Sequence, residues 1–432
     1  MPEERVDAIV VGAGPAGASA AITLARAGLE VVLLERGAFP GAKNVMGGIL
    51  YREPTEQLVP NFWREAPLER AIIEQRYLLL TGDSALGGTY RTQAFAAEPY
   101  NSFSVMRGDF DQWFAGKAEE AGAFLVPQML VVDLIWRDGH VVGVRTGEAE
   151  GDLFADVVVL ADGANSLLAQ RAGLHDEWQP RDQALVAKEL IQLSEERIND
   201  RFNVPAGLGV AMEVFGQSTR GLLGYGFIYT NRDTLSIGTG ALLSDLIESG
   251  INVSDMLNEF KAHPAIAPML AGGETVEYSA HLIPEGGWKA LPRLFSDGAL
   301  VVGDAAGLVN PINREGSNFA MISGKLAAQA IVEAKAARDY SAVALSRYQE
   351  LLENSFVLRD LYTIRNVTDF AHARPHLLSG IPEALSRAAR EYLTVDDVPK
   401  SVKQRRIVQI LREGLQPRRL AGDLVGAARM LR

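Results

Sequence analysis

The 432 residues exceed one ordinary domain of roughly 100–200 residues, so the length predicts two or three compact units. There are 54 acidic and 42 basic side chains, and the net charge of −12 argues against nucleic acid as the main partner. Cysteine is absent, which excludes disulfides, a thiol nucleophile and an iron–sulfur cluster bound by thiolates of this chain. The six His residues form no ligand pattern, so no metal site is predicted. The composition indicates a soluble, intracellular protein with an organic cofactor.

The first predicted elements form a nucleotide-binding unit. A short β-branched strand over 7–11 runs into a G-x-G-x-x-G motif at 12–17, and an Ala/Leu-rich helix follows up to residue 27. A second buried strand over 31–34 ends at Glu35. A strand, this motif, a helix, a strand and an acid in that order are typical of dinucleotide binding.

Each part of this motif has a physical role. Gly12 permits the tight turn, Gly14 lets a pyrophosphate approach the backbone, and Gly17 lets helix and strand pack closely. The helix N-terminus offers unpaired N–H groups to the phosphates. Glu35 can accept the ribose hydroxyl protons. We therefore expect a bound dinucleotide.

Three later segments favour FAD over NAD. A predicted helix starts at Arg107, a buried strand over 157–160 precedes Asp162-Gly163, and a strand over 300–302 precedes Gly303-Asp304-Ala305. With these segments the chain resembles the flavoprotein hydroxylase and reductase superfamily. The resemblance implies that Asp304 holds the ribitol and that Arg107 lies near the phosphates.

A further helix is predicted over 319–337, opened by the small and N-capping residues Gly316, Ser317 and Asn318. A helix N-terminus directed at the N1/O2 edge of the flavin would stabilise negative charge there.

A narrower resemblance rests on strings between these motifs. They are Glu35-Arg36-Gly37, residues 39–51, 226–231, Phe260-Lys261-Ala262-His263-Pro264 and 277–287, which contains Ala280-His281-Leu282-Ile283-Pro284-Glu285-Gly286-Gly287. They resemble the electron transfer flavoprotein:quinone oxidoreductase family, and within it the short bacterial branch, the FixC or EtfC subunit of FixABCX-type complexes. The resemblance implies that the loop 41–48 lies beside the isoalloxazine ring.

The cofactor-binding residues predicted in this way are Gly12, Gly14, Ala16, Gly17, Glu35, Arg36, Lys43, Asn44, Gly47, Gly48, Arg107, Asp162, Gly163, Gly303, Asp304, Gly316, Ser317 and Asn318. No general acid–base pair or nucleophile stands out, as expected when the cofactor carries the chemistry. Tyr278 and His281 could deliver protons to a quinone. Alternatively, Tyr278, Ala280 and Leu282 alternate along a strand, with His281 on its wetter face.

The predicted fold class is α/β with α+β. A Rossmann-like FAD-binding domain of the glutathione-reductase type is expected over 1–180 and 291–345. An antiparallel-sheet substrate or quinone domain over 181–290 interrupts it, and 346–432 is expected to be mainly helical.

The predicted helical end carries a basic tail. Residues 400–432 have a net charge of +7, which leaves −19 for the first 399 residues. Ile407, Ile410, Leu411 and Leu415 recur at helical spacing beside arginines. This pattern suits an anionic membrane surface, an acidic partner subunit, or packing on the acidic body of the protein itself.

The resemblance implies an electron-transfer subunit that takes electrons from an electron transfer flavoprotein with alpha- and beta-type subunits. It would pass them to a quinone through a small ferredoxin-like FixX-type protein, because the cluster domain of the full-length quinone oxidoreductase needs cysteines that are absent here. The alternatives are a geranylgeranyl (prenyl) reductase and a flavin-dependent hydroxylase, which share the FAD motifs. With no export signal and no spanning helix in the sequence, we expect a cytoplasmic protein, or one peripheral on the inner face of the cell membrane.

Overall fold

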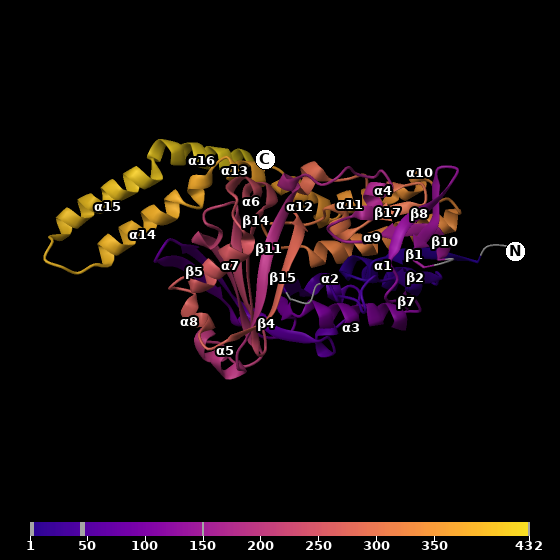
Figure 1. Cartoon of the computed structure of the whole chain (residues 1–432), viewed down its shortest axis with the longest axis horizontal. Coiled ribbons are helices and arrows are strands. Elements are labelled where there is room, and N and C mark those ends of the chain that lie inside the picture. Colours follow the sequence, from indigo (N-terminus) through magenta and orange to yellow (C-terminus); the bar gives the residue numbers. More distant parts are fainter. Residues whose placement is uncertain (1–3, 44–47, 149–150, 431–432) are drawn as a thin grey trace. The chain divides into compact units, whose positions relative to one another are not determined.

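The computed structural model describes residues 4–43, 48–148 and 151–430, which form two compact units (Figure 1). The first unit comprises Met1–Glu69, Pro99–Gln183 and Leu282–Tyr362, and the second comprises Arg70–Glu98, Ala184–His281 and Thr363–Arg432. Each unit is therefore built from three separate stretches of chain. The predicted fold class, a Rossmann-like unit combined with a sheet unit and a helical C-terminus, is confirmed.

The first unit is built on a mainly parallel sheet with the strand order β16-β17-β10-β1-β2-β7. Its strands are β1 (Arg5–Val11), β2 (Val31–Leu34), β7 (Phe124–Val126), β8 (Val131–Arg137), β9 (His140–Thr146), β10 (Asp152–Leu160), β16 (Phe295–Ser296) and β17 (Ala299–Val301). The hairpin β8–β9 joins this sheet through antiparallel pairing of β9 with β10. The strands β3 (Gly48–Tyr51) and β6 (Ser102–Val105), which pair antiparallel, also lie in this unit.

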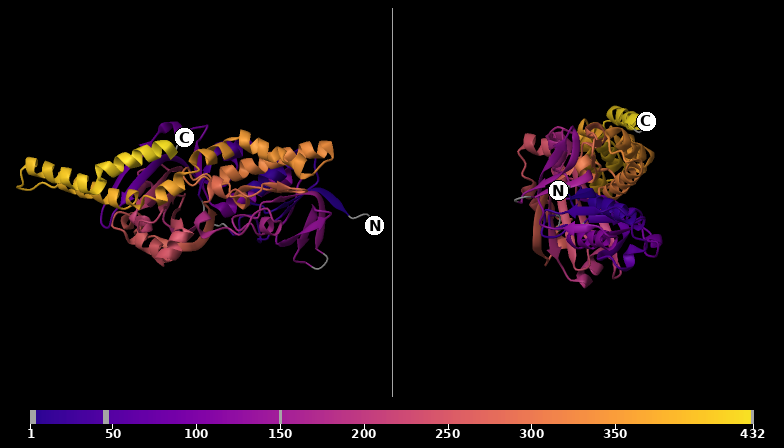
Figure 2. Two further views of the ribbon diagram at one scale, coloured as in Figure 1. Left: turned by 90° about the horizontal axis from the view of Figure 1, so that it is seen from above. Right: turned by 90° about the vertical axis from the view of Figure 1, so that its right-hand side faces the viewer.

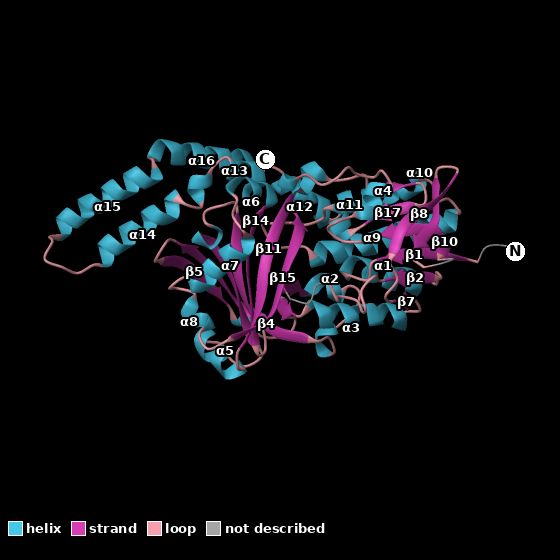
Figure 3. Cartoon of the chain, viewed as in Figure 1, coloured by secondary structure: helices cyan, strands magenta, loops and turns pink. Residues whose placement is uncertain are grey.

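The helices of the first unit are α1 (Pro15–Arg26), α2 (Arg52–Glu56), α3 (Arg107–Glu120), α4 (Leu167–Arg171), α9 (Ser317–Ala337), α10 (Ala342–Leu345), α11 (Arg347–Asn354) and α12 (Phe356–Ile364) (Figure 3). Helix α1 packs against α9 and α3. A Cβ on Gly324 of α9 would lie only 2.0 Å from the carbonyl oxygen of Ala16. The two helices approach closely because small residues face each other.

Burial on both faces explains why the C-terminal parts of β1 and β10 have no polar side chains. Ala8, Ile9 and Val10 are fully buried, as are Val157 to Leu160. Parallel strands covered on both faces become continuous apolar runs. The paired registers bring the carboxyl ends of β1 and β10 to the same edge of the sheet, where Val11 lies opposite Leu160.

The second unit contains a sheet with the strand order β15-β11-β14-β13-β12-β4, and β5 pairs with β4. Its strands are β4 (Leu68–Leu80), β5 (Ala85–Arg91), β11 (Gln183–Gln192), β12 (Leu208–Gly216), β13 (Gly224–Thr230), β14 (Thr234–Leu242) and β15 (Glu274–Pro284). The sheet is not wholly antiparallel as predicted, because β12 pairs with β4 in parallel. The long connection between these two strands permits that orientation.

The helices of the second unit are α5 (Glu195–Phe202), α6 (Leu243–Ser249), α7 (Val253–Ala262), α8 (Ala267–Leu270), α13 (Val367–His372), α14 (Gly380–Leu393), α15 (Lys400–Leu415) and α16 (Pro417–Met430). Phe202 of α5 and Phe260 of α7 lie in the buried core with Ile228 and Ile237 of the sheet. Helices α14 and α15 pack side by side as a helical hairpin, drawn in orange to yellow in Figure 2.

The observed units differ from the predicted domains in several places, and residues 282–290 and 346–362 belong to the first unit. Residues 70–98 belong to the second unit because β4 and β5 extend its sheet through the pairing of β4 with β12. Residues 363–432 also belong to the second unit rather than forming a region of their own. No helix in the described ranges is long and apolar enough to span a bilayer.

Candidate functional site

The glycine motif forms the turn between β1 and α1. Gly12 has φ +105°, which favours glycine, and a Cβ there would lie 2.2 Å from the carbonyl oxygen of Ala161. A Cβ on Gly17 would lie 1.8 Å from the carbonyl oxygen of Gly12. Gly14 behaves differently, because a Cβ there meets nothing within 4 Å. The open space above Gly14 is where the motif predicts a pyrophosphate.

Helix α1 begins without a side-chain cap. Gly14 is its N-cap, and Pro15 is its first residue. The first N–H groups of a helix have no intrahelical acceptors, and they carry partial positive charge. This uncapped N-terminus beside open space is suited to an anionic group.

Glu35 is held in place by the backbone around it. Its Oε2 accepts the N–H of Ala13 at 3.1 Å, and its Oε1 accepts the N–H of Gly37 at 2.6 Å. Each carboxylate oxygen can accept further hydrogen bonds. The acid at the end of β2 is therefore preorganised, with acceptor capacity left for hydroxyl donors.

Contacts between glycines and the neighbouring backbone bring the separate motifs together. Gly12 abuts Ala161, directly before Asp162 at the end of β10. A Cβ on Gly303, whose φ is +61°, would lie 2.8 Å from the Cβ of Ala16. The motifs at 12–17, 162–163 and 303–304 thus converge at one edge of the parallel sheet.

Asp162 has one carboxylate oxygen without a hydrogen-bond partner. Its Oδ2 accepts the N–H of Leu168 at 3.0 Å, while its Oδ1 is buried with no partner. Burial raises the pKa of Asp162, against the opposing effects of the Leu168 N–H, His175 and Arg36. A buried acceptor of this kind is suited to a ligand that brings a donor.

Arg107, at the first position of α3, lies between two carboxylates. Its Nε and Nη2 donate to Asp111 Oδ1 and Oδ2 at 2.8 and 2.7 Å, and Asp111 is only 2% exposed. Burial raises the pKa of Asp304, and the charge of Arg107 opposes that rise. Gly41, with φ +86°, packs on this pair, since its Cβ would lie 2.9 Å from that of Asp111. Asp111 and Asp304 thus lie on either side of the Arg107 charge, and Gly41 packs on the pair of Arg107 and Asp111.

Helix α9 begins at Ser317, after Gly316 as N-cap and without the predicted side-chain cap. Asn318 is 5% exposed, and its Oδ1 is buried without a hydrogen-bond partner. Asn318 Nδ2 donates instead to Glu315 Oε1 at 3.1 Å, which explains the missing cap. The start of α9 therefore also has uncapped N–H groups and an unpartnered acceptor.

The remaining predicted cofactor residues lie in more open positions. Arg36 and Lys43 are exposed. A Cβ on Gly48 or Gly163 would meet nothing within 4 Å, and Gly163 has φ +80°. Asn44 and Gly47 lie outside the described residues.

Taken together, the residues of the first unit fit a bound FAD. The buried, unpartnered acceptors Asp162 Oδ1 and Asn318 Oδ1, the open space at Gly14 and the preorganised Glu35 are the kinds of group that such a cofactor requires. Within the described residues, no group of three or more His, Asp or Glu side chains could hold a metal ion.

The family string at 260–264 is used for packing in the second unit. Phe260 is buried so closely that a Cβ on Gly226 would lie 2.9 Å from its ring. Lys261 Nζ pairs with Glu189 Oε2 at 2.7 Å. The side chains of this string have fixed partners within the fold. The string therefore contributes no open binding site.

The last side chain of that string, His263, is 5% exposed and also fully engaged. Its Nδ1 accepts the N–H of Ala265 at 3.2 Å, so the proton lies on Nε2, which donates to the carbonyl oxygen of Thr81 at 2.7 Å. His263 therefore joins α7 to the turn after β4.

Side chains alternate along β15 as predicted, but the face that carries Tyr278 and Ala280 is the exposed one. Tyr278 is exposed, and its hydroxyl is hydrogen-bonded to Ser254 Oγ at 2.6 Å, whereas His281 is half-buried. The hydrogen bond to Ser254 places the hydroxyl of Tyr278 beside the start of α7.

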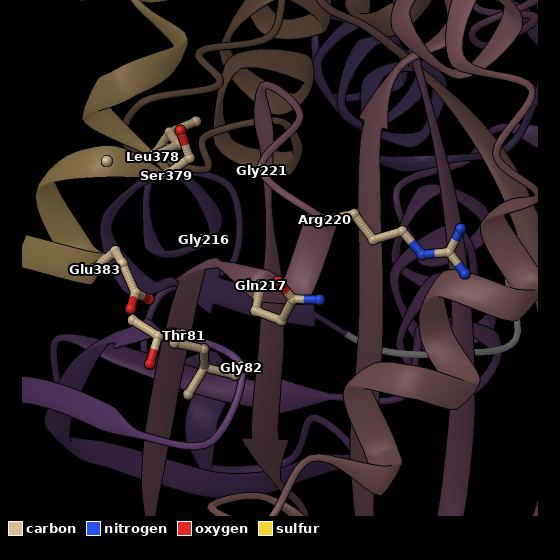
Figure 4. Close-up of a pocket in the computed structure, with 11 residues that line it drawn as sticks. Thr81, Gly82, Gly216, Gln217, Arg220, Gly221, Leu378, Ser379 and Glu383 are labelled. Carbon is tan, nitrogen blue, oxygen red and sulfur yellow. The ribbon is translucent and has the colours of Figure 1, made fainter. Parts of the chain in front are cut away.

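A cavity of about 380 Å³ lies in the second unit (Figure 4). Thr81, Gly216 and the start of α14 at Leu378–Gly380 form its walls. Arg220 also lines it, but its side chain extends away from Thr81 and α14 and forks onto Glu259. No predicted cofactor residue lines this cavity.

Sequence reasoning gave no role to three residues that support the site. Asp111 follows Arg107 at helical i,i+4 spacing, and that spacing signals the ion pair. Ser166, which follows the Asp162-Gly163 motif, donates to the carbonyl oxygen of Ala305 at 2.8 Å and ties two cofactor segments together. Glu315, two residues before the start of α9, has no local signal for its role.

Comparison with protein families gives two matches. Residues 7–192 match a family described as FAD dependent oxidoreductase, and residues 367–432 match the ETF-QO/FixC family C-terminal domain. The first match spans the glycine motif and Asp162, and the second spans the helical hairpin.

Full-length relatives agree with both matches. The chain is 45% identical to Protein FixC of Bradyrhizobium diazoefficiens over 94% of each chain, and 44% identical to Protein FixC of Azorhizobium caulinodans over 100% of each. Protein FixC of Escherichia coli K12 is 41% identical over 95% of each chain.

Solved structures share the fold at lower identity. A geranylgeranyl bacteriochlorophyll reductase-like protein of Thermoplasma acidophilum superimposes with a TM-score of 0.74 at 20% identity, over 95% of this chain and 97% of that one. The myxobacterial chondrochloren halogenase CndH gives 0.65 at 21% identity, over 83% and 82%. The match to the FAD dependent oxidoreductase family, together with the FixC relatives, shows that the cofactor is FAD and that the chain is an oxidoreductase. On its sequence relatives, the chain belongs to the FixC branch of the ETF-QO/FixC family of FAD-dependent oxidoreductases.

Proposed function

We propose that the chain is the electron-transfer subunit that accepts electrons from an electron transfer flavoprotein. It passes them through a ferredoxin-like partner to a quinone. The observation that carries this proposal is an FAD-dependent oxidoreductase chain with 0 Cys that is 45% identical to a FixC protein. Without thiolates this chain cannot ligate an iron–sulfur cluster, so a cluster on the route to quinone belongs to a separate protein.

Within this proposal the first unit holds the cofactor. The N–H groups at the start of α1 bind the pyrophosphate above Gly14, and Glu35 accepts the ribose hydroxyls. Asp304, beside Arg107, accepts hydroxyls of the ribitol. The start of α9 and the loop 41–48 receive the isoalloxazine ring.

FAD, when bound, supplies one- and two-electron redox chemistry, so the chain needs no nucleophile of its own. The task of its side chains is to bind the cofactor, orient it and set its electrostatic surroundings. This division agrees with a site made of backbone N–H groups and carboxylates rather than an acid–base pair.

The experiment is affinity purification from the native host, with a visible spectrum and identification of the co-purifying chains. We expect bound FAD together with two flavoprotein subunits and a small cysteine-rich ferredoxin. FAD on a solitary chain that turns over a prenyl substrate would replace this proposal with a prenyl reductase. Oxygen-dependent NAD(P)H oxidation with substrate would replace it with a hydroxylase.

We further propose that the hairpin α14–α15 makes peripheral contact with the inner face of the cell membrane. Tyr392 and Leu393 are 72% exposed and Val395 is 87% exposed at its tip, whereas the helical apolar residues predicted from sequence are half-buried beside α14. Arg405 and Arg412 are exposed and make no ion pair with a described residue. Exposed apolar residues on a hairpin whose second helix carries exposed arginines suit an anionic lipid surface.

Flotation with vesicles of phosphatidylglycerol and phosphatidylcholine tests this contact. Parent protein should float, and a variant with Tyr392, Leu393 and Val395 all changed to Ser should not. Equal flotation of both would contradict the contact at the tip and leave the redox proposal intact.

A further inference from the structure

The loop before α9 is fixed by Asn310, which is fully buried. Its Oδ1 accepts the N–H groups of Ile312 and Asn313 at 3.1 and 3.2 Å. These two backbone donors determine which way the amide points, so that Nδ2 donates to Glu315 Oε2 at 3.1 Å. The backbones of Asn310 and Glu315 also exchange two hydrogen bonds, at 3.1 and 3.0 Å.

Glu315 passes this orientation on to Asn318. Its second oxygen, Oε1, accepts Asn318 Nδ2 at 3.1 Å. Because both carboxylate oxygens accept from amide donors, the pattern is that of the ionised form. Asn318 must then leave its Oδ1 as the buried atom without a partner. Glu315 thus decides whether Asn318 offers the site an acceptor or a donor.

The same carboxylate places negative charge at the amino end of α9. Burial raises the pKa of Glu315, and the carboxyl of Asp360 on α12 adds to the rise, while the amides of Asn310, Asn313 and Asn318 oppose it. A helix N-terminus normally carries partial positive charge that favours added electrons nearby. Glu315 offsets that charge.

We propose that Glu315 is a positioning residue that turns Asn318 Oδ1 toward the cofactor and lowers the midpoint potential of the flavin. The inference rests on the proposed function, which puts the isoalloxazine ring at the start of α9. That ring carries one N–H donor, at N3, which suits an unpartnered amide oxygen. Reduction adds negative charge to the ring, and a fixed carboxylate nearby disfavours that charge.

The test is a spectroelectrochemical titration of the purified FAD-containing protein with its partners, comparing parent with Glu315→Gln at one pH. The substitution removes the charge, and its amide group lets Asn318 turn over and present Nδ2. Both effects predict an upward shift of the midpoint potential.

Glu333→Gln is the matched control, because it makes the same change on α9 far from the start of the helix. With a rise of 1.5 Å per residue, Glu333 lies about 24 Å from Ser317. Glu333 is exposed and pairs with Arg347, so its loss should leave the potential unchanged. Asp360→Asn is a second variant, which removes a neighbouring charge without touching the loop. It should shift the potential upward by less than Glu315→Gln does.

An unchanged or lowered potential in Glu315→Gln, with FAD retained, would overturn the inference. If Glu315→Gln loses FAD, Asp360→Asn decides: an upward shift supports the role of charge at this position, and no shift overturns it. A parent protein that cannot be loaded with FAD would refute the proposed function, and this inference with it, before any variant is measured.

Discussion

The two units use their family-specific residues in opposite ways. In the second unit, Phe260, Lys261 and His263 of one string are each bound to a fixed partner. In the first unit, Asp162 Oδ1 and Asn318 Oδ1 are buried without partners. A specific sequence string therefore marks a binding site only where the folded chain leaves its polar atoms unsatisfied.

The largest effect is expected for Gly12→Ala. The new Cβ would lie 2.2 Å from the carbonyl oxygen of Ala161, in a backbone conformation with φ +105°. We expect destabilisation by about 3–5 kcal/mol and complete loss of FAD. Urea unfolding and the visible spectrum measure both. A yellow protein of parental stability would contradict the close contact between β1 and β10.

A comparable loss of stability is expected in the second unit for Arg70→Met. The buried guanidinium donates to Asn199 Oδ1, Leu208 O and Arg232 O at 2.6, 3.0 and 2.8 Å. Its removal leaves these buried acceptors without a donor and should lower the free energy of unfolding by about 3–5 kcal/mol. The FAD content at low temperature should stay at the parental level. Loss of FAD without loss of stability would erase the distinction between the units.

Glu285 gives a pH-dependent prediction in the string that ends in the first unit. Its carboxyl group makes no hydrogen bond or ion pair with a described residue, and burial raises its pKa to about 8 from 4.5. The folded state therefore binds the proton more tightly than the unfolded state does. The contribution of protonated Glu285 to the free energy of unfolding is fully present below about pH 4.5. It is lost as the pH rises to about 8.

Glu285→Gln should remove this dependence. The stability advantage of the variant over the parent should grow between pH 4.5 and 8 and then level off. Urea unfolding at a series of pH values measures it. Parallel curves for the two proteins would show that Glu285 is not a buried carboxyl without a partner.

Gly14→Ala separates binding from folding. Its Cβ meets no protein atom within 4 Å, and its φ of −74° suits alanine. The free energy of unfolding of the apoprotein should change by less than about 0.5 kcal/mol. The affinity for FAD should fall about tenfold or more, which is about 1.4 kcal/mol, because the methyl group occupies the space of the pyrophosphate. Unchanged affinity in a fluorescence titration would contradict the site.

The smallest effect is expected for His263→Gln. The amide can replace the Nε2–H donor to Thr81 but fits the Ala265 N–H less well. We expect a loss of about 1 kcal/mol in stability and no change in the FAD spectrum. An altered spectrum would mean that this string serves the cofactor after all.

The cofactor half of the site could be predicted because its constraints are local. Gly12, Gly14, Gly17 and Glu35 lie within 24 residues, and the reason for each is contained in one strand–helix–strand unit. The strands before Asp162 and Asp304 were recognisable because they are buried on both faces. Their convergence then follows from parallel pairing.

The rest depends on contacts between distant residues. No local pattern indicates that β4 pairs with β12, about 140 residues later, so residues 70–98 were predicted in the other domain. The spacing of the apolar residues of α15 suits a lipid surface, a partner or the protein itself equally, and only the folded chain shows that they pack beside α14. Glu315 was missed because its importance comes from two asparagines whose orientations only the folded loop fixes.

The central claim is that this FAD accepts electrons from an electron transfer flavoprotein. The most direct measurement is anaerobic stopped-flow mixing of the FAD-loaded protein with reduced electron transfer flavoprotein from the same host, followed by the flavin absorbance. We predict rapid bleaching of the FAD band of this chain and much slower bleaching with NADH alone. A band that stays oxidised with the reduced flavoprotein, yet bleaches on turnover with a prenyl or hydroxylation substrate, would contradict the claim.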